Sequence, residues 1–243
     1  MRVRDGKILL SSYHFERLFA GMALLKINQT FTDTLLKDKV HELCSLNNCM
    51  ESARVRLSIN RCDDKPEYII DSSPFDPKTY QWNEAGLSIG IFEDARKSCD
   101  AFANLKSANR LPYVMAGLYA IENSLDDCLL LNTEGNIADS TISNLFLIRD
   151  DMIITPSLDE GCVAGVMRRY LISKLQAASY QLQERSCSIK DLFKADEVFL
   201  TNAIRGIQWV RSYKRSVYEH KRTREIFDQF IENLKPVSLQ NGD

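Results

Sequence analysis

One stretch of the chain joins a lysine to a helix start: Asn104-Leu105-Lys106-Ser107-Ala108-Asn109-Arg110-Leu111-Pro112. Pro112 suits the first turn of a helix, because that turn does not need the amide hydrogen that proline lacks. The pattern predicts a helix from there to about Asn123. Lys106 has apolar or small neighbours in sequence, and a poorly solvated setting lowers the pKa of a lysine and favours its use as a nucleophile. Taken alone, the segment is better explained by an exposed lysine in a loop.

A second segment has the form of an anion-binding helix start. Residues 161–169 read GCVAGVMRR, with Gly165 opening an amphipathic helix predicted to continue through Leu175. Backbone N–H groups at a helix start bind dianions such as phosphate, and an arginine strengthens the site. An ordinary helix start is the alternative explanation.

Two further segments complete an ordered set, HFERL at residues 14–18 and GNIADSTISNLF at residues 135–146. Together with the two segments above, they resemble the class IV family of pyridoxal-phosphate enzymes, those of fold type IV. This family holds D-amino-acid aminotransferases, branched-chain aminotransferases and 4-amino-4-deoxychorismate lyases. The resemblance covers essentially the whole chain and implies one two-domain α+β enzyme that binds pyridoxal phosphate.

The resemblance assigns roles to individual residues. Lys106 matches the lysine that holds the cofactor, and Arg17 matches an arginine that binds its phosphate. Asp139 stands where the family has a glutamate facing the ring nitrogen, one methylene shorter. The other implied cofactor contacts are Val163 against the ring and, on the phosphate, Val166, Met167, Asn202 and Ala203. Met167 cannot supply the hydroxyl that the family has at this position.

The order of predicted elements favours an α+β fold, because strand pairs come first and helices and strands are mixed afterwards. Turn-forming residues before the strand near Gly86 place a domain boundary between a small domain at 1–82 and a larger cofactor-binding domain at 83–243. The chain opens within a strand pair that turns at Asp5-Gly6. We therefore expect the N-terminal domain to lack its first strands. The tail after Pro236 is expected to be loose.

Composition excludes several classes of partner. The 31 Lys+Arg and 33 Asp+Glu give a net charge of −2, which offers no whole-chain attraction to nucleic acid or an anionic membrane. The seven cysteines are irregularly spaced, as in a protein with reduced thiols, and the three histidines lack metal-type spacing. No apolar run approaches the roughly 18 residues of a membrane span. These features favour the cytoplasm and predict no metal site.

Three functions stay open. The Lys106-x-x-Asn109-Arg110-Leu111 pattern and the Thr201-Asn202-Ala203 segment are closest to 4-amino-4-deoxychorismate lyases, which release 4-aminobenzoate and pyruvate for folate synthesis. The first alternative is an aminotransferase for branched-chain or D-amino acids. The second is a non-catalytic family member that only binds the cofactor, which Asp139 and Met167 would fit. The resemblance also implies a small-molecule amino substrate and a homodimer.

Overall fold

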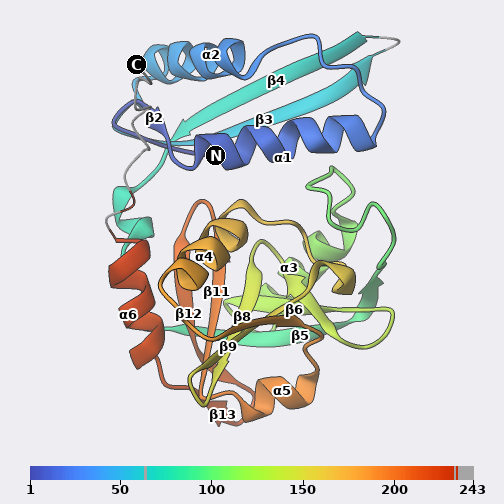
Figure 1. The fold of residues 1–243 in the computed structure, drawn as a ribbon, viewed down its shortest axis with the longest axis vertical. Coiled ribbons are helices and arrows are strands. Elements are labelled where there is room, and N and C mark those ends of the chain that lie inside the picture. Colours follow the sequence, from blue (N-terminus) through green and yellow to red (C-terminus); the bar gives the residue numbers. More distant parts are fainter. Residues whose placement is uncertain (63–64, 233, 235–243) are drawn as a thin grey trace. The chain divides into compact units, whose positions relative to one another are not determined.

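The computed structural model describes residues 1–62, 65–232 and 234, and it divides into two compact units, Met1–Gln81 and Trp82–Glu232 (Figure 1). Both units combine helices with sheets, and the second sheet is mixed, so the α+β prediction is confirmed. The tail after Pro236, expected to be loose, lies outside the described residues. Among the described helices, none has the length and apolar character needed to cross a membrane.

The first unit is a four-stranded antiparallel sheet with two helices. Its strands lie in the order β2-β1-β3-β4. Their bounds are β1 Arg2–Arg4, β2 Lys7–Ile8, β3 Ser52–Cys62 and β4 Lys65–Pro74, and the helices are α1 Ser11–Leu24, α2 Asp33–Leu46 and the 3-10 turn η1 Pro77–Tyr80. The Asp5-Gly6 turn between β1 and β2 has positive φ at both residues, 49° and 72°, as a tight hairpin requires.

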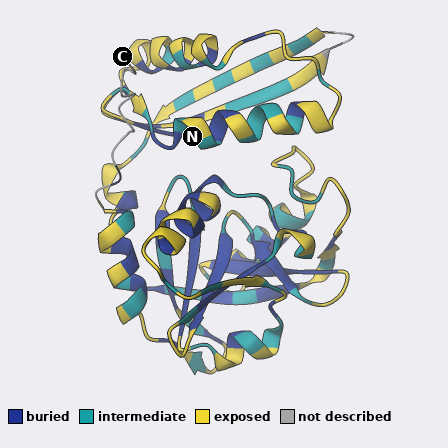
Figure 2. Ribbon diagram, in the orientation of Figure 1, coloured by how far each residue is buried: buried dark blue, intermediate teal, exposed yellow. Residues whose placement is uncertain are grey.

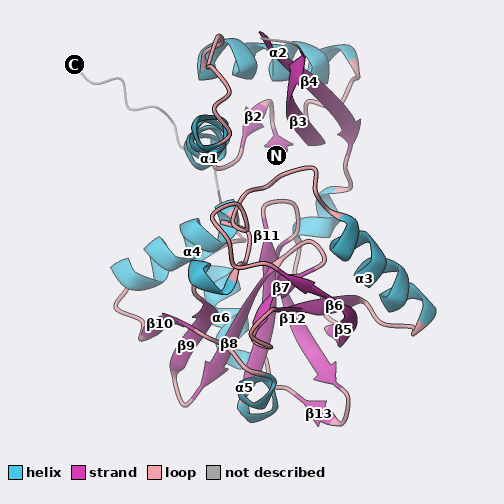
Figure 3. Ribbon diagram, turned by 90° about the vertical axis from the view of Figure 1, so that its right-hand side faces the viewer, coloured by secondary structure: helices cyan, strands magenta, loops and turns pink. Residues whose placement is uncertain are grey.

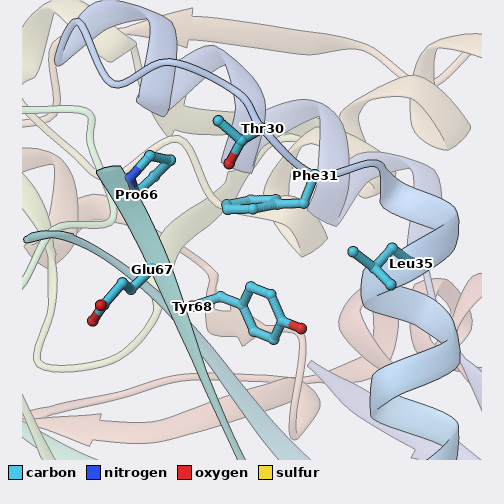
Figure 4. A pocket seen from close by; sticks show the side chains of 6 residues that line it. All are labelled: Thr30, Phe31, Leu35, Pro66, Glu67 and Tyr68. Carbon is cyan, nitrogen blue, oxygen red and sulfur yellow. The ribbon is translucent and has the colours of Figure 1, made fainter. Parts of the chain in front are cut away.

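Alternation in the strands decides which side chains of this unit are buried. Val3, Ala53 and Val55 pack against Val40 and Cys44 of α2. A second cluster gathers Phe15 and Met22 of α1 with Phe31 and Leu36. An open hollow beside it is lined by Thr30, Phe31, Leu35, Pro66, Glu67 and Tyr68 and contains none of the predicted site residues (Figure 4).

Two helices of this unit show what local sequence leaves open. Serine is a common helix cap, yet α1 follows Leu10, whose φ is 53°, and no side chain caps it, Ser12 included. In α2, Leu35 is 41% exposed, whereas its neighbour Leu36 is fully buried. The reason is that Leu36, Val40 and Cys44, four residues apart, form the stripe that faces the sheet.

The second unit is built on a nine-stranded mixed sheet. Its main path is β10-β9-β8-β11-β12-β5-β6-β7, and β13 pairs with β12. The strand bounds are β5 Leu87–Lys97, β6 Asp127–Asn132, β7 Ile137–Ser140, β8 Asn144–Arg149, β9 Met152–Pro156, β10 Leu182–Arg185, β11 Glu197–Asn202, β12 Gly206–Tyr213 and β13 Ser216–Val217. The helices are α3 Leu111–Glu122, α4 Val166–Ala177, α5 Ile189–Lys194, α6 Lys221–Phe230 and the 3-10 turn η2 Leu158–Glu160.

Buried residues of this unit concentrate in its strands, as Figure 2 shows. Every residue of β6 and β7 is buried. The strands β7 and β12 were not predicted from the sequence. Val217 belongs to β13, and the last helix, α6, begins at Lys221. The predicted Pro112 helix start is confirmed, because α3 carries proline in its first turn.

Candidate functional site

Asp139 lies at the centre of a buried polar cluster. It belongs to β7, opposite Leu130 of β6, and is 2% exposed. The Lys97 ammonium group, at the end of β5, donates to Asp139 Oδ1 at 3.1 Å and to Oδ2 at 2.9 Å. The Tyr113 hydroxyl of α3 donates to Oδ2 at 3.1 Å, and the Val163 amide donates to Oδ2 at 2.9 Å. Figure 3 shows α3 beside β5 and β6, which brings these groups together.

Burial sets the protonation of this cluster. It raises the pKa of the Asp139 carboxyl, whereas the Lys97 charge and the hydrogen bonds from Val163, Lys97 and Tyr113 favour the ionised form. Burial, together with the Asp139 charge, raises the pKa of the Tyr113 hydroxyl far above its usual range. Tyr113 therefore stays protonated and donates its hydrogen to the carboxylate.

Two glycines let the loop before α4 approach its neighbours closely. Gly161 has φ of 78°, and a Cβ there would lie 2.3 Å from the Ser98 carbonyl oxygen. A Cβ at Gly165 would lie 1.9 Å from Asn144 Oδ1. Asn144 in turn donates from Nδ2 to the Val163 carbonyl at 2.8 Å. The loop is thereby fixed against the start of β8, and α4 begins after Gly165 without a side-chain cap.

The second predicted phosphate loop, Thr201-Asn202-Ala203, also lies beside the start of β8. Thr201 of β11 pairs with Asn144 of β8, and Asn202 Nδ2 donates to Ser143 Oγ at 2.9 Å. Asn202 Oδ1 accepts the amides of Ile204 and Arg205, both at 2.9 Å. The Asn202 side chain therefore shapes its own turn, and Ser143-Asn144 contacts both predicted phosphate loops.

Lys106 lies in the loop between β5 and α3. Its neighbour Asn104 donates from Nδ2 to the Leu158 carbonyl at 2.8 Å and to the Cys162 carbonyl at 2.7 Å. The Ala164 amide donates to the Asn104 carbonyl at 3.0 Å. Asn104 thus holds the Lys106 loop against the segment that also contacts Asp139. Lys106 itself is exposed, so the expectation of a poorly solvated lysine is wrong for the chain alone.

The predicted site residues therefore fall into two groups. Lys106, Asp139 and the residues of the two phosphate loops belong to the second unit, where hydrogen bonds tie their segments together. Val163 is partly exposed, Val166 and Met167 are buried, and Asn202 and Ala203 are partly exposed. Arg17 is half-buried in α1 of the first unit, and its place in an anion site stays a prediction.

Sequence reasoning did not identify Lys97 and Tyr113. A buried carboxylate needs a cationic or hydrogen-bonding partner, so Asp139 itself signals that such groups exist. The sequence does not say which ones, because Lys97 and Asp139 are 42 residues apart. Within the described residues, no cluster of three or more His, Cys, Asp and Glu side chains could hold a metal ion.

These residues fit pyridoxal phosphate. Each carboxylate oxygen offers two lone pairs. In the described part of the chain Asp139 Oδ1 accepts one bond, which leaves it a lone pair for a ring N–H, while Oδ2 accepts three. The uncapped start of α4 suits a phosphate dianion. Lys106 lies on a loop fastened to the segment between these two points.

Changing Gly165 to alanine should disturb this arrangement through a steric clash alone. Its φ of −68° and ψ of 136° suit alanine, but the new Cβ would displace Asn144. We expect the free energy of unfolding to fall by about 1–3 kcal/mol, the usual range for overpacking, and pyridoxal phosphate to bind more weakly. Chemical unfolding and a cofactor titration would measure both.

Gly117→Ala is the matched control. Gly117 lies in α3, and no atom lies within 4 Å of a Cβ placed there. Alanine in a helix interior is favoured over glycine by about 0.5–1 kcal/mol, so this variant should be as stable as the parent or more so. Equal behaviour of the two variants would contradict the close contact at Gly165.

Several known proteins are similar to this chain. The family model "Amino-transferase class IV" matches residues 1–213. An aminodeoxychorismate lyase of Vibrio harveyi is 27% identical over 221 residues, 85% of this chain and 79% of its own length. A crystal structure of 4-amino-4-deoxychorismate lyase from Pseudomonas aeruginosa has a TM-score of 0.82 at 26% identity, covering 96% of this chain and 89% of that one.

The fold is shared more widely. A branched-chain amino acid aminotransferase from Thermobaculum terrenum, solved in its pyridoxal-phosphate form, has a TM-score of 0.82 at 22% identity and covers 94% of this chain and 81% of its own. The family match covers the first unit and most of the second. The chain therefore belongs to the class IV aminotransferase family of pyridoxal-phosphate enzymes.

Proposed function

We propose that this protein is a cytoplasmic 4-amino-4-deoxychorismate lyase that binds pyridoxal phosphate through Lys106 and forms 4-aminobenzoate and pyruvate, a step of folate synthesis. The observation that carries the proposal is the fastening of the Lys106 loop, through Asn104, to the segment that contacts Asp139. The lyase relatives and the Lys106-x-x-Asn109-Arg110-Leu111 pattern favour this member of the family.

Each group has a defined task. When bound, pyridoxal phosphate supplies an electron sink for charge that develops on the substrate. Asp139 holds the ring nitrogen through Oδ1. The start of α4 and the loop after β11 hold the phosphate with backbone amides, with Arg17 as the proposed cationic partner. Met167 lies at the α4 start and supplies an amide there, without a side-chain hydroxyl.

Lys106 is the proposed proton carrier. Its amine takes the proton from the substrate ring carbon that bears the amino group, and the C–O bond on the neighbouring ring carbon breaks. The ring becomes aromatic, and the released enolpyruvate takes up a proton and tautomerises to pyruvate. An aminotransferase would use the same amine to move the substrate proton to the cofactor carbon instead. Both reactions need an amine that reaches the substrate carbon, and an exposed side chain on a fastened loop allows such a movement.

Product analysis tests the proposal. We expect the protein incubated with pyridoxal phosphate and 4-amino-4-deoxychorismate to release 4-aminobenzoate and pyruvate in equal amounts. The aminotransferase alternative predicts instead transfer from branched-chain or D-amino acids to a 2-oxo acid. Cofactor binding without either product would identify a non-catalytic family member and refute the lyase.

We also propose that the protein is a homodimer. One face of α3 exposes a stripe of apolar side chains, and contiguous exposed apolar patches often mark protein–protein contacts. The stripe consists of Leu111 and the residues three, four, seven and ten positions after it. These are Val114, Met115, Leu118 and Ile121, and all five side chains are between 44% and 75% exposed. A second copy of the chain would cover this stripe.

Light scattering at micromolar concentration should therefore show a dimer. Leu118→Glu, which places a charge within the stripe, should give a monomer. Leu46→Glu is the control, since Leu46 is 73% exposed at the end of α2, far from the stripe along the chain. A parent protein that is monomeric, or two variants that associate equally, would contradict the assignment.

A further inference from the structure

Lys97 is a second lysine beside the predicted cofactor site. Its residue is 7% exposed, and its ammonium lies within hydrogen-bond distance of both Asp139 oxygens. The ammonium also lies 4.8 Å from the centre of the Tyr113 ring, in cation–π contact. The mechanism proposed above gives Lys97 no task.

The backbone directs Lys97 inward. The pairing of β5 with β6 shifts between Phe92 and Arg96, so that Arg96 lies opposite Leu131 and Lys97 opposite Asn132. β5 has three more residues than β6 at this shift, a bulge-like irregularity, and bulges re-aim the side chains that follow them. Arg96 is consequently exposed and Lys97 buried at the end of the strand. Without the bulge, the regular in-and-out alternation of side chains along β5 would have placed the Lys97 ammonium elsewhere. The bulge therefore gives Asp139 its ammonium partner.

The charge of Lys97 affects how readily Asp139 can stabilise a second cation, the protonated ring nitrogen of the cofactor. The carboxylate carries one negative charge, and Lys97 already compensates it. A protonated ring nitrogen at Oδ1 would be a second cation on the same carboxylate, and a like charge nearby disfavours the protonated form of a base. Two neighbouring groups, Tyr113 and Cys162, are neutral, burial having raised the pKa of the Cys162 thiol to about 11. The cations behind them are Arg110, which acts on Tyr113, and Arg168, which acts on Cys162 and pairs with Glu184, whereas Lys97 is the cation that acts on Asp139 itself.

We propose that Lys97 is a positioning residue that fixes Asp139 with Oδ1 toward the cofactor ring and lowers the proton affinity of the ring nitrogen. Lys97 and Val163 occupy Oδ2 together with Tyr113, so only Oδ1 has a lone pair for the ring. This inference rests on the proposed binding of pyridoxal phosphate. It adds that the carboxylate is shared between two cations, so that the electron sink is weaker than one supported by an unshared carboxylate.

Nuclear magnetic resonance of pyridoxal phosphate that carries the NMR-active nitrogen isotope in its ring tests the inference directly. The ring-nitrogen signal of the loaded protein is followed against pH. In Lys97→Met the ring nitrogen should stay protonated to a pH about one to three units higher than in the parent, the usual effect of one nearby charge. Lys97→Arg, which keeps the charge, should titrate close to the parent.

Lys97→Gln separates charge from hydrogen bonding, because it retains a donor for Asp139 but no charge. It should show the same displaced titration as Lys97→Met, and it serves if the methionine variant fails to fold. Lys190→Met is the control for loss of a positive charge elsewhere, since Lys190 is exposed on α5. Titration of both Lys97 variants at the parental pH would overturn the inference.

Unfolding of the cofactor-free protein gives an independent readout. Lys97→Met and Asp139→Asn should each lower the free energy of unfolding, and the double variant should lose less than the sum, because each single change leaves one buried charge without its partner. Additive losses would overturn the pairing. A parent protein that binds no pyridoxal phosphate would refute the proposed function, whereas binding with unchanged titration refutes only the role of Lys97.

Discussion

Replacing Lys106 by alanine should lower turnover by about 100- to 10,000-fold, the range expected when a positioned proton carrier is lost. The same change should abolish covalent retention of pyridoxal phosphate. Lys106 is exposed on its loop, so the substitution removes no core packing, and the free energy of unfolding of the cofactor-free protein should stay the same. Turnover, chemical unfolding and borohydride reduction followed by peptide mapping are the measurements.

Peptide mapping shows whether the cofactor is attached to Lys106 or to Lys97, nine residues earlier in the chain. Reduction should place the cofactor on the peptide with Lys106, although Lys97 is the lysine that contacts Asp139 directly. The Lys97 ammonium is buried and held by the Asp139 carboxylate at 2.9 Å, whereas Lys106 is exposed on its loop. Lys174→Ala, an exposed lysine of α4, is the control and should keep turnover and label. Label on Lys97 would show that the assignment of Lys106 is wrong.

Replacing Asp139 by alanine should reduce both stability and turnover. The Lys97 ammonium would remain buried without its carboxylate, and breaking a buried ion pair in this way costs about 3–5 kcal/mol. Turnover should fall severely in the protein that still folds, because the ring nitrogen loses its carboxylate. Asp139→Glu should retain or raise activity, since it restores the side-chain length of the family pattern. Chemical unfolding and steady-state kinetics would measure the two effects.

Glu197→Ala is the matched control for a buried carboxylate. Glu197 is 5% exposed at the start of β11, the end opposite Asn202, and accepts the amides of Arg222 and Thr223 at the beginning of α6. Its loss should lower the free energy of unfolding, while the folded protein keeps its turnover. Unchanged turnover in Asp139→Ala as well would remove Asp139 from the mechanism.

The sequence predicted those features that a few consecutive residues decide. The Asp5-Gly6 turn, the proline start of α3 and the glycine start of α4 follow from local backbone preferences, and each lies where the sequence placed it. The motif segments led to the family, which the comparison over residues 1–213 confirms. The short strand β7, whose four residues end in an aspartate and a serine, gave no such local signal.

The spacing of apolar residues along a helix does not always show which face of the helix is buried. In α2 the leucine pair Leu35-Leu36 offers two rotations of the helix with nearly equal apolar content. Packing against the rest of the unit favours the rotation that buries Leu36. Lys106 shows the same limit, since apolar neighbours in the sequence did not bury it: Phe102 is itself 57% exposed. Burial depends on what packs over a segment, which its own residues do not specify.

By itself, the sequence determined the helix and turn starts, the α+β class and the set of segments from which the site is made, because these depend on contacts within a few residues. Only the tertiary structure decided that Lys97 is the ionic partner of Asp139 and that Asn144 and Asn104 fasten the loops around it. These contacts join residues that are 42, 19 and 58 positions apart. They depend on the order of strands in the sheet and on one bulge in β5, which no local pattern encodes.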